Sequence, residues 1–126
     1  MILVLVFIPL LSGAAAFLIR RDAPRRALLA CAAIAHAAVA ASAWMHPPAP
    51  LFGGWLALDA LGLLFLSIAS AVFLAAALYA LGYLPRMRHE PDSDSPFGAQ
   101  PEAIFTGCLL LFLASMTLIC ASAHFG

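Results

Sequence analysis

Residues 60–84, ALGLLFLSIASAVFLAAALYALGYL, decide the fold class, because they form an apolar run of 25 residues without a charged side chain. A helix rises about 1.5 Å per residue and a bilayer's hydrocarbon core is about 30 Å thick, so about 20 such residues suffice to cross it. The run is apolar in succession and does not alternate as a membrane β-strand would. It therefore predicts a transmembrane helix.

The same pattern occurs three more times along the chain. Further charge-free runs cover residues 2–19, 27–45 and 103–123. The connections between the four runs are residues 20–26, 46–59 and 85–102. The sequence therefore predicts an all-α polytopic membrane protein in which residues 1–126 form a single four-helix unit.

Composition supports this class and excludes others. Apolar residues make up 65% of the chain and charged residues 10%, whereas soluble domains average about 45–50% and about 25%. The formal net charge is zero, with six Arg and no Lys, so nothing predicts a nucleic-acid partner. The lipid bilayer is the partner that the composition predicts.

Arginine placement predicts the orientation. The connection at 20–26 contains four Arg, the connection at 85–102 contains Arg86 and Arg88, and the connection at 46–59 contains none. Short loops rich in Arg stay on the cytoplasmic side. We therefore expect 20–26 and 85–102 in the cytoplasm, 46–59 in the periplasm, and both termini on the periplasmic side.

His36 is the conventional acid–base side chain that the sequence places at membrane depth, since the four runs contain no Asp, Glu, Lys or Arg. Histidine titrates near neutral pH, so His36 is a candidate proton relay within a larger assembly. One imidazole cannot span about 30 Å of hydrocarbon. The alternative interpretation is a neutral ring that bonds to a neighbouring hydroxyl or backbone group.

Two acidic residues are expected at helix starts. Asp59 precedes the run at 60–84, and Asp22 precedes the run at 27–45. A carboxylate at this position accepts hydrogen bonds from the free amides of the first turn and meets the positive end of the helix dipole. We therefore interpret both as N-caps.

Other chemistry is not predicted for this chain. Cys31, Cys108 and Cys120 have neither paired spacing nor a ligand set, and we expect buried thiols. Asp92 and Asp94 belong to a Pro-rich acidic stretch that lacks the full oxygen set of a calcium loop. The sequence predicts no catalytic residue, no cofactor and no metal site.

Two segments resemble one family of membrane proteins. Residues 58–84 open with LDALGLLF and close with YALGY at 79–83, and residues 109–116 read LLLFLASM. They resemble the third and fourth helices of the antiporter-like subunits shared by respiratory complex I, Mrp cation/proton antiporters and membrane-bound hydrogenases. FTGCLLLFLASMTL at 105–118, followed by SAHFG, is most similar to the hydrogenase-4 and formate-hydrogenlyase branch.

The resemblance implies the N-terminal part of a proton- or cation-translocating subunit in the bacterial inner membrane. Its partners would be other membrane subunits of a respiratory or hydrogenase-type complex. Asp59 falls at a family motif position, whereas the glutamate of the family's fifth helix has no counterpart in these residues. The alternatives are a freestanding small four-helix transporter and a membrane assembly or scaffold protein.

Overall fold

The computed structural model describes residues 1–87 and 101–122. They form four helices, α1 (Ile2–Leu18), α2 (Asp22–Met45), α3 (Ala60–Met87) and α4 (Pro101–Ala121). A 3₁₀ helix, η1 (Phe52–Gly54), lies in the loop between α2 and α3. The predicted all-α class is confirmed.

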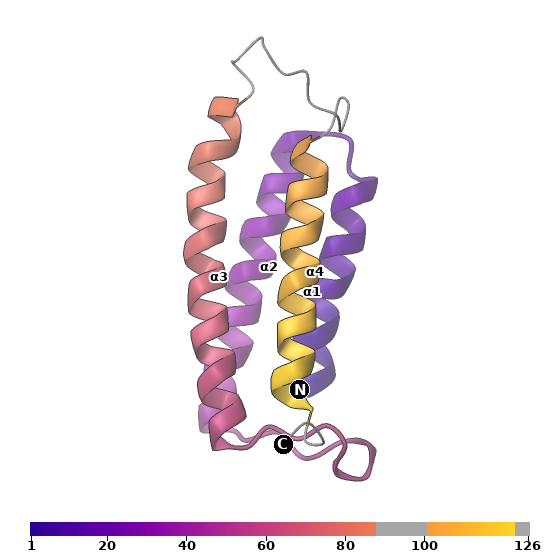
Figure 1. The fold of residues 1–126 in the computed structure, drawn as a ribbon, viewed down its shortest axis with the longest axis vertical. Helices are drawn as coiled ribbons and strands as arrows, with labels where there is room; N and C mark the ends of the chain where they lie inside the picture. Colours follow the sequence, from indigo (N-terminus) through magenta and orange to yellow (C-terminus); the bar gives the residue numbers. More distant parts are fainter. Residues whose placement is uncertain (88–100, 123–126) are drawn as a thin grey trace.

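The helices form a bundle whose members alternate in direction (Figure 1). The most extensive contacts join α1 to α4 and α2 to α3, while α2 also contacts α4 across the bundle. Within the described residues the backbones of α1 and α3 are not neighbours. We call the end with residues 18–26 the charged end and the end with residues 46–59 the loop end.

The helix bounds differ from the charge-free runs. α2 begins at Asp22 rather than at 27, and α3 continues through Pro85 to Met87. A helix can continue through charged and polar residues outside the hydrocarbon core of the bilayer. A charge-free run therefore gives the length of the apolar segment, and the hydrogen-bonded helix can be longer. α3 therefore extends three residues past the predicted bound of 84 and includes Pro85, and the acidic stretch with Asp92 and Asp94 lies outside the described residues.

α4 ends two residues before the predicted bound of 123 because the α2–α3 loop binds its last turn. Ala57 N donates a hydrogen bond to Ala121 O at 2.9 Å, and Leu56 forms an isolated bridge with Ser122. A second bridge joins Leu56 to Leu51 across η1. The loop thus closes the loop end beneath the helices (Figure 1).

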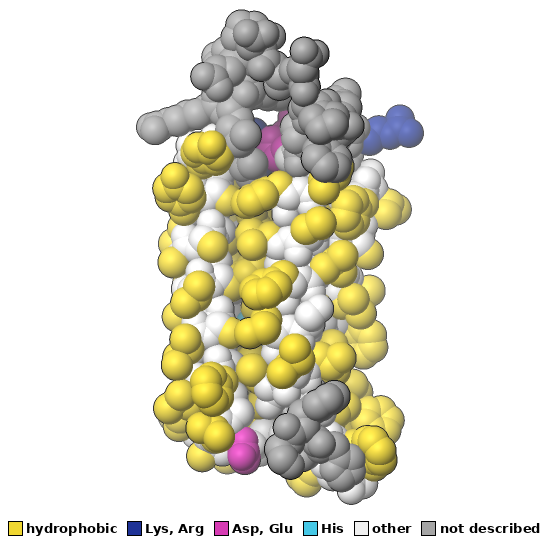
Figure 2. All heavy atoms as spheres, viewed as in Figure 1, with side chains coloured by type: hydrophobic (Ala, Val, Ile, Leu, Met, Phe, Trp, Pro, Cys, Tyr) yellow, Lys and Arg dark blue, Asp and Glu magenta, His cyan; other side chains and the backbone are white. Residues whose placement is uncertain are grey.

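Three helical segments are long and apolar enough to cross a membrane, namely Asp22–Met45, Ala60–Tyr83 and Glu102–Ala121. α1 is a shorter apolar helix of 17 residues. Large hydrophobic side chains cover the visible face of the bundle (Figure 2), as expected for helices that face lipid. These features indicate a membrane-embedded protein.

The buried core consists of two apolar clusters. One lies toward the charged end and includes Ala16, Leu29, Ala77, Leu110 and Leu113. The other lies toward the loop end and includes Ile2, Leu5, Ala43, Leu58, Leu63, Leu66 and Ala121. Between the two clusters, the buried faces of α2, α3 and α4 carry polar residues instead of apolar ones.

Glycines allow close approach at two helix contacts. A Cβ atom on Gly62 of α3 would lie 2.8 Å from Cys120 O of α4 and 2.9 Å from Asp59 Oδ1. On α4, Gly107 packs under the ring of Phe17 of α1. Small residues at these positions let membrane helices pack closely, as interhelical packing in lipid requires.

Gly62→Ala should therefore destabilise the bundle by about 1–3 kcal/mol, because the added methyl meets a backbone carbonyl that cannot move independently. Gly82→Ala is the matched control in the same helix, since nothing lies within 4 Å of its added Cβ. That control should gain about 0.5–1 kcal/mol from helix propensity. Unfolding in detergent micelles measures both, and equal stabilities would contradict the close approach.

Candidate functional site

Three side chains from three helices form a buried polar layer at the middle of the bundle, and we define the polar layer as His36, Ser70 and Thr117. His36 Nε2 lies 2.9 Å from Thr117 Oγ1, and Ser70 Oγ lies 3.0 Å from His36 Nδ1. All three residues are buried. Both ring nitrogens of the imidazole therefore have hydrogen-bond partners.

The hydroxyl of Thr117 determines which tautomer fits this arrangement. Thr117 Oγ1 donates its only proton to Leu113 O at 2.8 Å, one turn earlier in α4. It must then accept from His36, so Nε2 carries the ring proton. Nδ1 is left as an acceptor for the hydroxyl of Ser70. The geometry fits a neutral His36 that has no unsatisfied hydrogen-bonding nitrogen.

Proton uptake at His36 would need a rearrangement of the polar layer. Nδ1 is the ring nitrogen without a proton, so a proton taken up by the ring would bind there. Nδ1 faces the hydroxyl of Ser70, which donates to it. That hydroxyl would have to rotate before Nδ1–H could donate to it. The geometry therefore agrees with the interpretation of His36 as a bonded neutral ring, and the proton-relay role stays a prediction.

Asp59 lies immediately before α3, at the loop end. Its Oδ1 accepts a hydrogen bond from Gly62 N at 2.7 Å, and its backbone oxygen accepts from Leu63 N at 2.9 Å. This is the arrangement of an N-cap, in which a short side chain satisfies an amide of the first turn. Asp59 thus starts α3, and its prediction as an N-cap is confirmed.

Arg25 occupies a buried site at the charged end that the sequence analysis did not predict. Its side chain is 1% exposed, and Nε donates to Ala16 O at 3.1 Å. The guanidinium also donates to Ile19 O and, through Nη1, to Asp22 Oδ1 at 2.9 Å. The last carbonyls of a helix have no partner within it. Arg25 satisfies two carbonyls at the end of α1.

The Asp22 prediction is corrected by this geometry. Arg21 occupies the N-cap position of α2 without a side-chain capping bond, and Asp22 is the first helical residue. Its carboxylate pairs with Arg25 one turn later, which also places negative charge at the positive end of the helix dipole. Asp22 therefore orients an arginine rather than capping the helix from outside.

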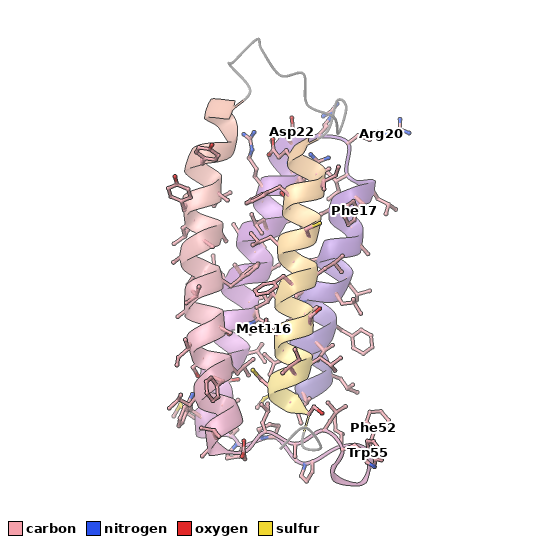
Figure 3. All side chains as sticks on the ribbon, viewed as in Figure 1. Phe17, Arg20, Asp22, Phe52, Trp55 and Met116 are labelled. Carbon is pink, nitrogen blue, oxygen red and sulfur yellow. The ribbon has the colours of Figure 1, made fainter. Side chains whose placement is uncertain are left out.

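Arg26 and Glu102 form a bidentate ion pair between α2 and α4. Arg26 Nε lies 2.6 Å from Glu102 Oε1, and Nη2 lies 3.0 Å from Oε2. Both side chains are largely buried, at 20% and 13% exposure. Two parallel charge-assisted bonds fix the relative position of the two helix starts. Arg20, by contrast, extends away from the bundle (Figure 3).

The cysteines lie elsewhere than expected. Cys31 and Cys108 are exposed on the outer surface, and Cys120 is half-buried, so the prediction of three buried thiols is wrong. A thiol is a weakly polar group, and lipid is apolar enough to accommodate it. Across residues 1–87 and 101–122, no three His, Cys, Asp or Glu side chains lie close enough together to hold a metal ion.

Part of the polar layer could have been found from periodicity. Ser70 lies on the same helix stripe as the buried Leu63, Leu66 and Phe73, and Thr117 lies on the stripe of Leu110 and Leu113. Most buried hydroxyls have a hydrogen-bond partner, although the hydroxyl of Thr106, on the same stripe as Thr117, has none among the described residues. The pairing of these hydroxyls with His36 depends on helix register, which one sequence does not reveal.

No protein-family model, curated protein or solved structure matches the chain.

His36→Leu and Thr117→Val should each destabilise the bundle, and their effects should not add. An interhelical hydrogen bond in a membrane protein contributes about 0.6 kcal/mol and at most about 1.7 kcal/mol. The double variant should therefore be less destabilised than the sum of the singles by about that amount. Reversible unfolding in mixed micelles measures this coupling. Additive effects would contradict the bond between Nε2 and Oγ1.

Arg25→Gln should lower stability by about 2–3 kcal/mol, because it leaves carbonyls of α1 without their partner inside the bundle. Arg20→Gln removes the same charge from an exposed side chain at the same end and should change stability little. Thermal unfolding of the two variants in one detergent gives the comparison. Equal effects would mean that Arg25 acts through its charge alone.

Proposed function

We propose that this chain is the N-terminal, structural part of an antiporter-like subunit in a redox-driven, ion-translocating complex of the bacterial inner membrane. In this proposal the chain packs within the ion-pumping arm, and the groups that move the ion belong to other segments. It contacts other membrane subunits of an NADH:quinone oxidoreductase-like or hydrogenase-like complex. His36 contributes to packing, with a relay role as the alternative.

The proposed topology has four membrane crossings, with both termini in the periplasm and the charged end in the cytoplasm. The 17 residues of α1 rise about 26 Å, at the short end of what a bilayer requires. Aromatic side chains support the two interfaces. Trp44 and Trp55 are exposed toward the loop end, and the rings of Tyr79 and Tyr83 stack with centroids 5.8 Å apart toward the charged end.

The observation that carries the structural role is the closed polar layer. Each nitrogen of His36 is bonded, Thr117 donates to its own helix, and apolar clusters lie on both sides along the bundle axis. Ion movement needs successive polar groups within hydrogen-bond or one-water reach. This interior ties α2, α3 and α4 together, and such a unit is suited to support a path formed elsewhere.

The resemblance motifs support the family assignment through the positions they occupy. LDALGLLF contains the Asp59 cap and the close approach at Gly62, and YALGY contains the stacked tyrosines. Each motif thus has a physical role in starting, packing or positioning α3. Asp59 and Gly62 place the start of α3 in the bundle, whereas Tyr79 and Tyr83 are exposed on its outer surface.

Affinity purification of the tagged chain from its source bacterium, in a mild detergent, tests the proposal. The chain should migrate in a large assembly together with hydrophilic iron–sulfur or hydrogenase-type subunits. Recovery of the chain alone as a stable oligomer would contradict the proposal and favour a freestanding transporter. Recovery with assembly factors only would favour a scaffold.

His36→Gln, measured in the intact assembly, separates packing from proton relay. Glutamine can still donate and accept hydrogen bonds but does not titrate, so the packing role should survive. Proton or sodium transport by inverted membrane vesicles should stay within about twofold of wild type. A loss of ten-fold or more with normal assembly would establish the relay alternative.

A further inference from the structure

The loop between α2 and α3 contains a tight turn at residues 51–56, LFGGWL, which we call the LFGGWL turn. Leu51 N donates a hydrogen bond to Leu56 O at 2.8 Å, and Leu56 N donates back to Leu51 O at 3.2 Å. Inside the turn, Gly54 N donates to Leu51 O and Trp55 N donates to Phe52 O. The turn therefore satisfies most of its own amides, as a segment beside hydrocarbon must.

The base of the LFGGWL turn is fixed to the bundle. Ala57 N donates to Ala121 O at 2.9 Å, and Leu56 forms its bridge with Ser122. The side chains of Leu51 and Leu56 pack against the apolar cluster at the loop end. The turn therefore has a set position relative to α4.

The tip of the turn presents two large rings outward. Phe52 is 69% exposed and Trp55 is 63% exposed. Figure 3 shows both rings at the outer edge of the loop end, and Figure 1 shows the turn extending sideways from the bundle. Residues 47–58 contain no charged side chain and no histidine. The tip is thus an uncharged, apolar projection.

Phe52 is held in an unfavourable backbone conformation. Its φ is 53°, and Gly53 and Gly54 follow with φ of 67° and 97°. Glycine adopts positive φ readily, whereas a bulky side chain is strained there. The hydrogen bonds between Leu51 and Leu56 hold Phe52 in this conformation, and its exposed ring gains little contact with the bundle in return. Strain of this kind clusters at sites of interaction, so the ring points to a partner outside the chain.

The position of the turn selects the bilayer as that partner. The ion pairs at the charged end mark one boundary of the hydrocarbon core. From there α1 rises about 26 Å, which is about 4 Å less than the thickness of the core. Hydrocarbon therefore reaches past Ile2 to the level of the loop. Leu3 and Val4 are exposed at this end of α1, so the lipid-facing surface of the bundle continues toward the turn.

We propose that the LFGGWL turn is a fixed interfacial anchor, whose Phe52 and Trp55 rings insert at the boundary between headgroups and acyl chains in the leaflet at the loop end. An uncharged turn with internal hydrogen bonds can enter this layer, where aromatic rings are favoured and bury apolar surface. The proposal depends only on the bundle and the bilayer around it. It is therefore independent of the proposed function.

Tryptophan fluorescence in lipid vesicles tests the anchor on the complete 126-residue chain. The chain has two tryptophans, so Trp44→Phe leaves Trp55 as the reporter. Phosphatidylcholine brominated near the headgroup should quench Trp55 about twofold more than lipid brominated near the chain end, because the ring lies at the interface. Quenching by neither lipid would overturn the proposal.

Iodide in the surrounding buffer separates the bilayer from other environments. Trp55 should be quenched by iodide about threefold less than N-acetyltryptophanamide, because the headgroup layer covers the ring. Full quenching by iodide would place the tip in water. Protection from iodide and from both brominated lipids would mean that protein covers the tip. Either result would overturn the proposal.

The same measurement applies to the strained residue. In a chain that combines Trp44→Phe, Trp55→Phe and Phe52→Trp, the reporter at position 52 should show the same preference for bromine near the headgroup. Phe112→Trp in a chain with Trp44→Phe and Trp55→Phe is the matched control, because Phe112 is exposed in the middle of α4. It should be quenched more by bromine near the chain end. Equal depth profiles at positions 52 and 112 would overturn the interfacial location.

Phe52→Gly distinguishes contact with lipid from packing within the protein. Glycine adopts the φ of this position without strain, so the thermal stability of the bundle in detergent should stay the same or rise. Leu51→Gly is the comparison in the same turn, and it should lower the Tm because Leu51 packs against the apolar cluster. A lower Tm for Phe52→Gly would show that the ring packs within the protein and would overturn its assignment to lipid.

Discussion

Hydrocarbon provides no hydrogen-bond partners, so a polar group that this bundle buries can find one only in another part of the bundle; among the described residues the buried hydroxyl of Thr106 has none. His36 meets that constraint with one hydroxyl from α3 and one from α4, and the second hydroxyl completes the chain by donating to a carbonyl of its own helix. The glycine contacts at Gly62 and Gly107 each align one pair of helices, whereas the polar layer requires three helices at one height. It therefore determines how α2, α3 and α4 align along the bundle axis.

The existence of the four helices could be predicted from the sequence, because bilayer thickness sets a minimum apolar length that each run satisfies or approaches. The cap at Asp59 could also be predicted, since a short acidic residue before an apolar run is a local signal. The early end of α4 could not, because it depends on hydrogen bonding between Ala57 and Ala121, which are far apart in sequence. The partners of His36 likewise depend on tertiary register.

The arginines show how identical residues acquire different roles through position. In the sequence the four arginines of residues 20–26 form one signal, but their side chains differ, and Arg20 is exposed and points away from the bundle. Arg25 instead turns inward to the open end of α1, which ends in an extended residue without a glycine cap. A helix that ends in this way leaves carbonyls that a long, many-donor side chain can satisfy. A count of arginines in the sequence cannot separate these roles, because Arg20 and Arg25 both lie in the short connection at residues 20–26.

The ion pair between Arg26 and Glu102 also has a consequence for the order in which the parts of the bundle assemble. The two residues are 76 positions apart, and at about 5–20 residues per second the acidic partner is synthesised about 4–15 s after the arginine. During that interval Arg25 already has its acidic partner Asp22 within the same connection, whereas Arg26 lacks the carboxylate of Glu102. The arrival of α4 then supplies the partner of Arg26 and joins the starts of α2 and α4.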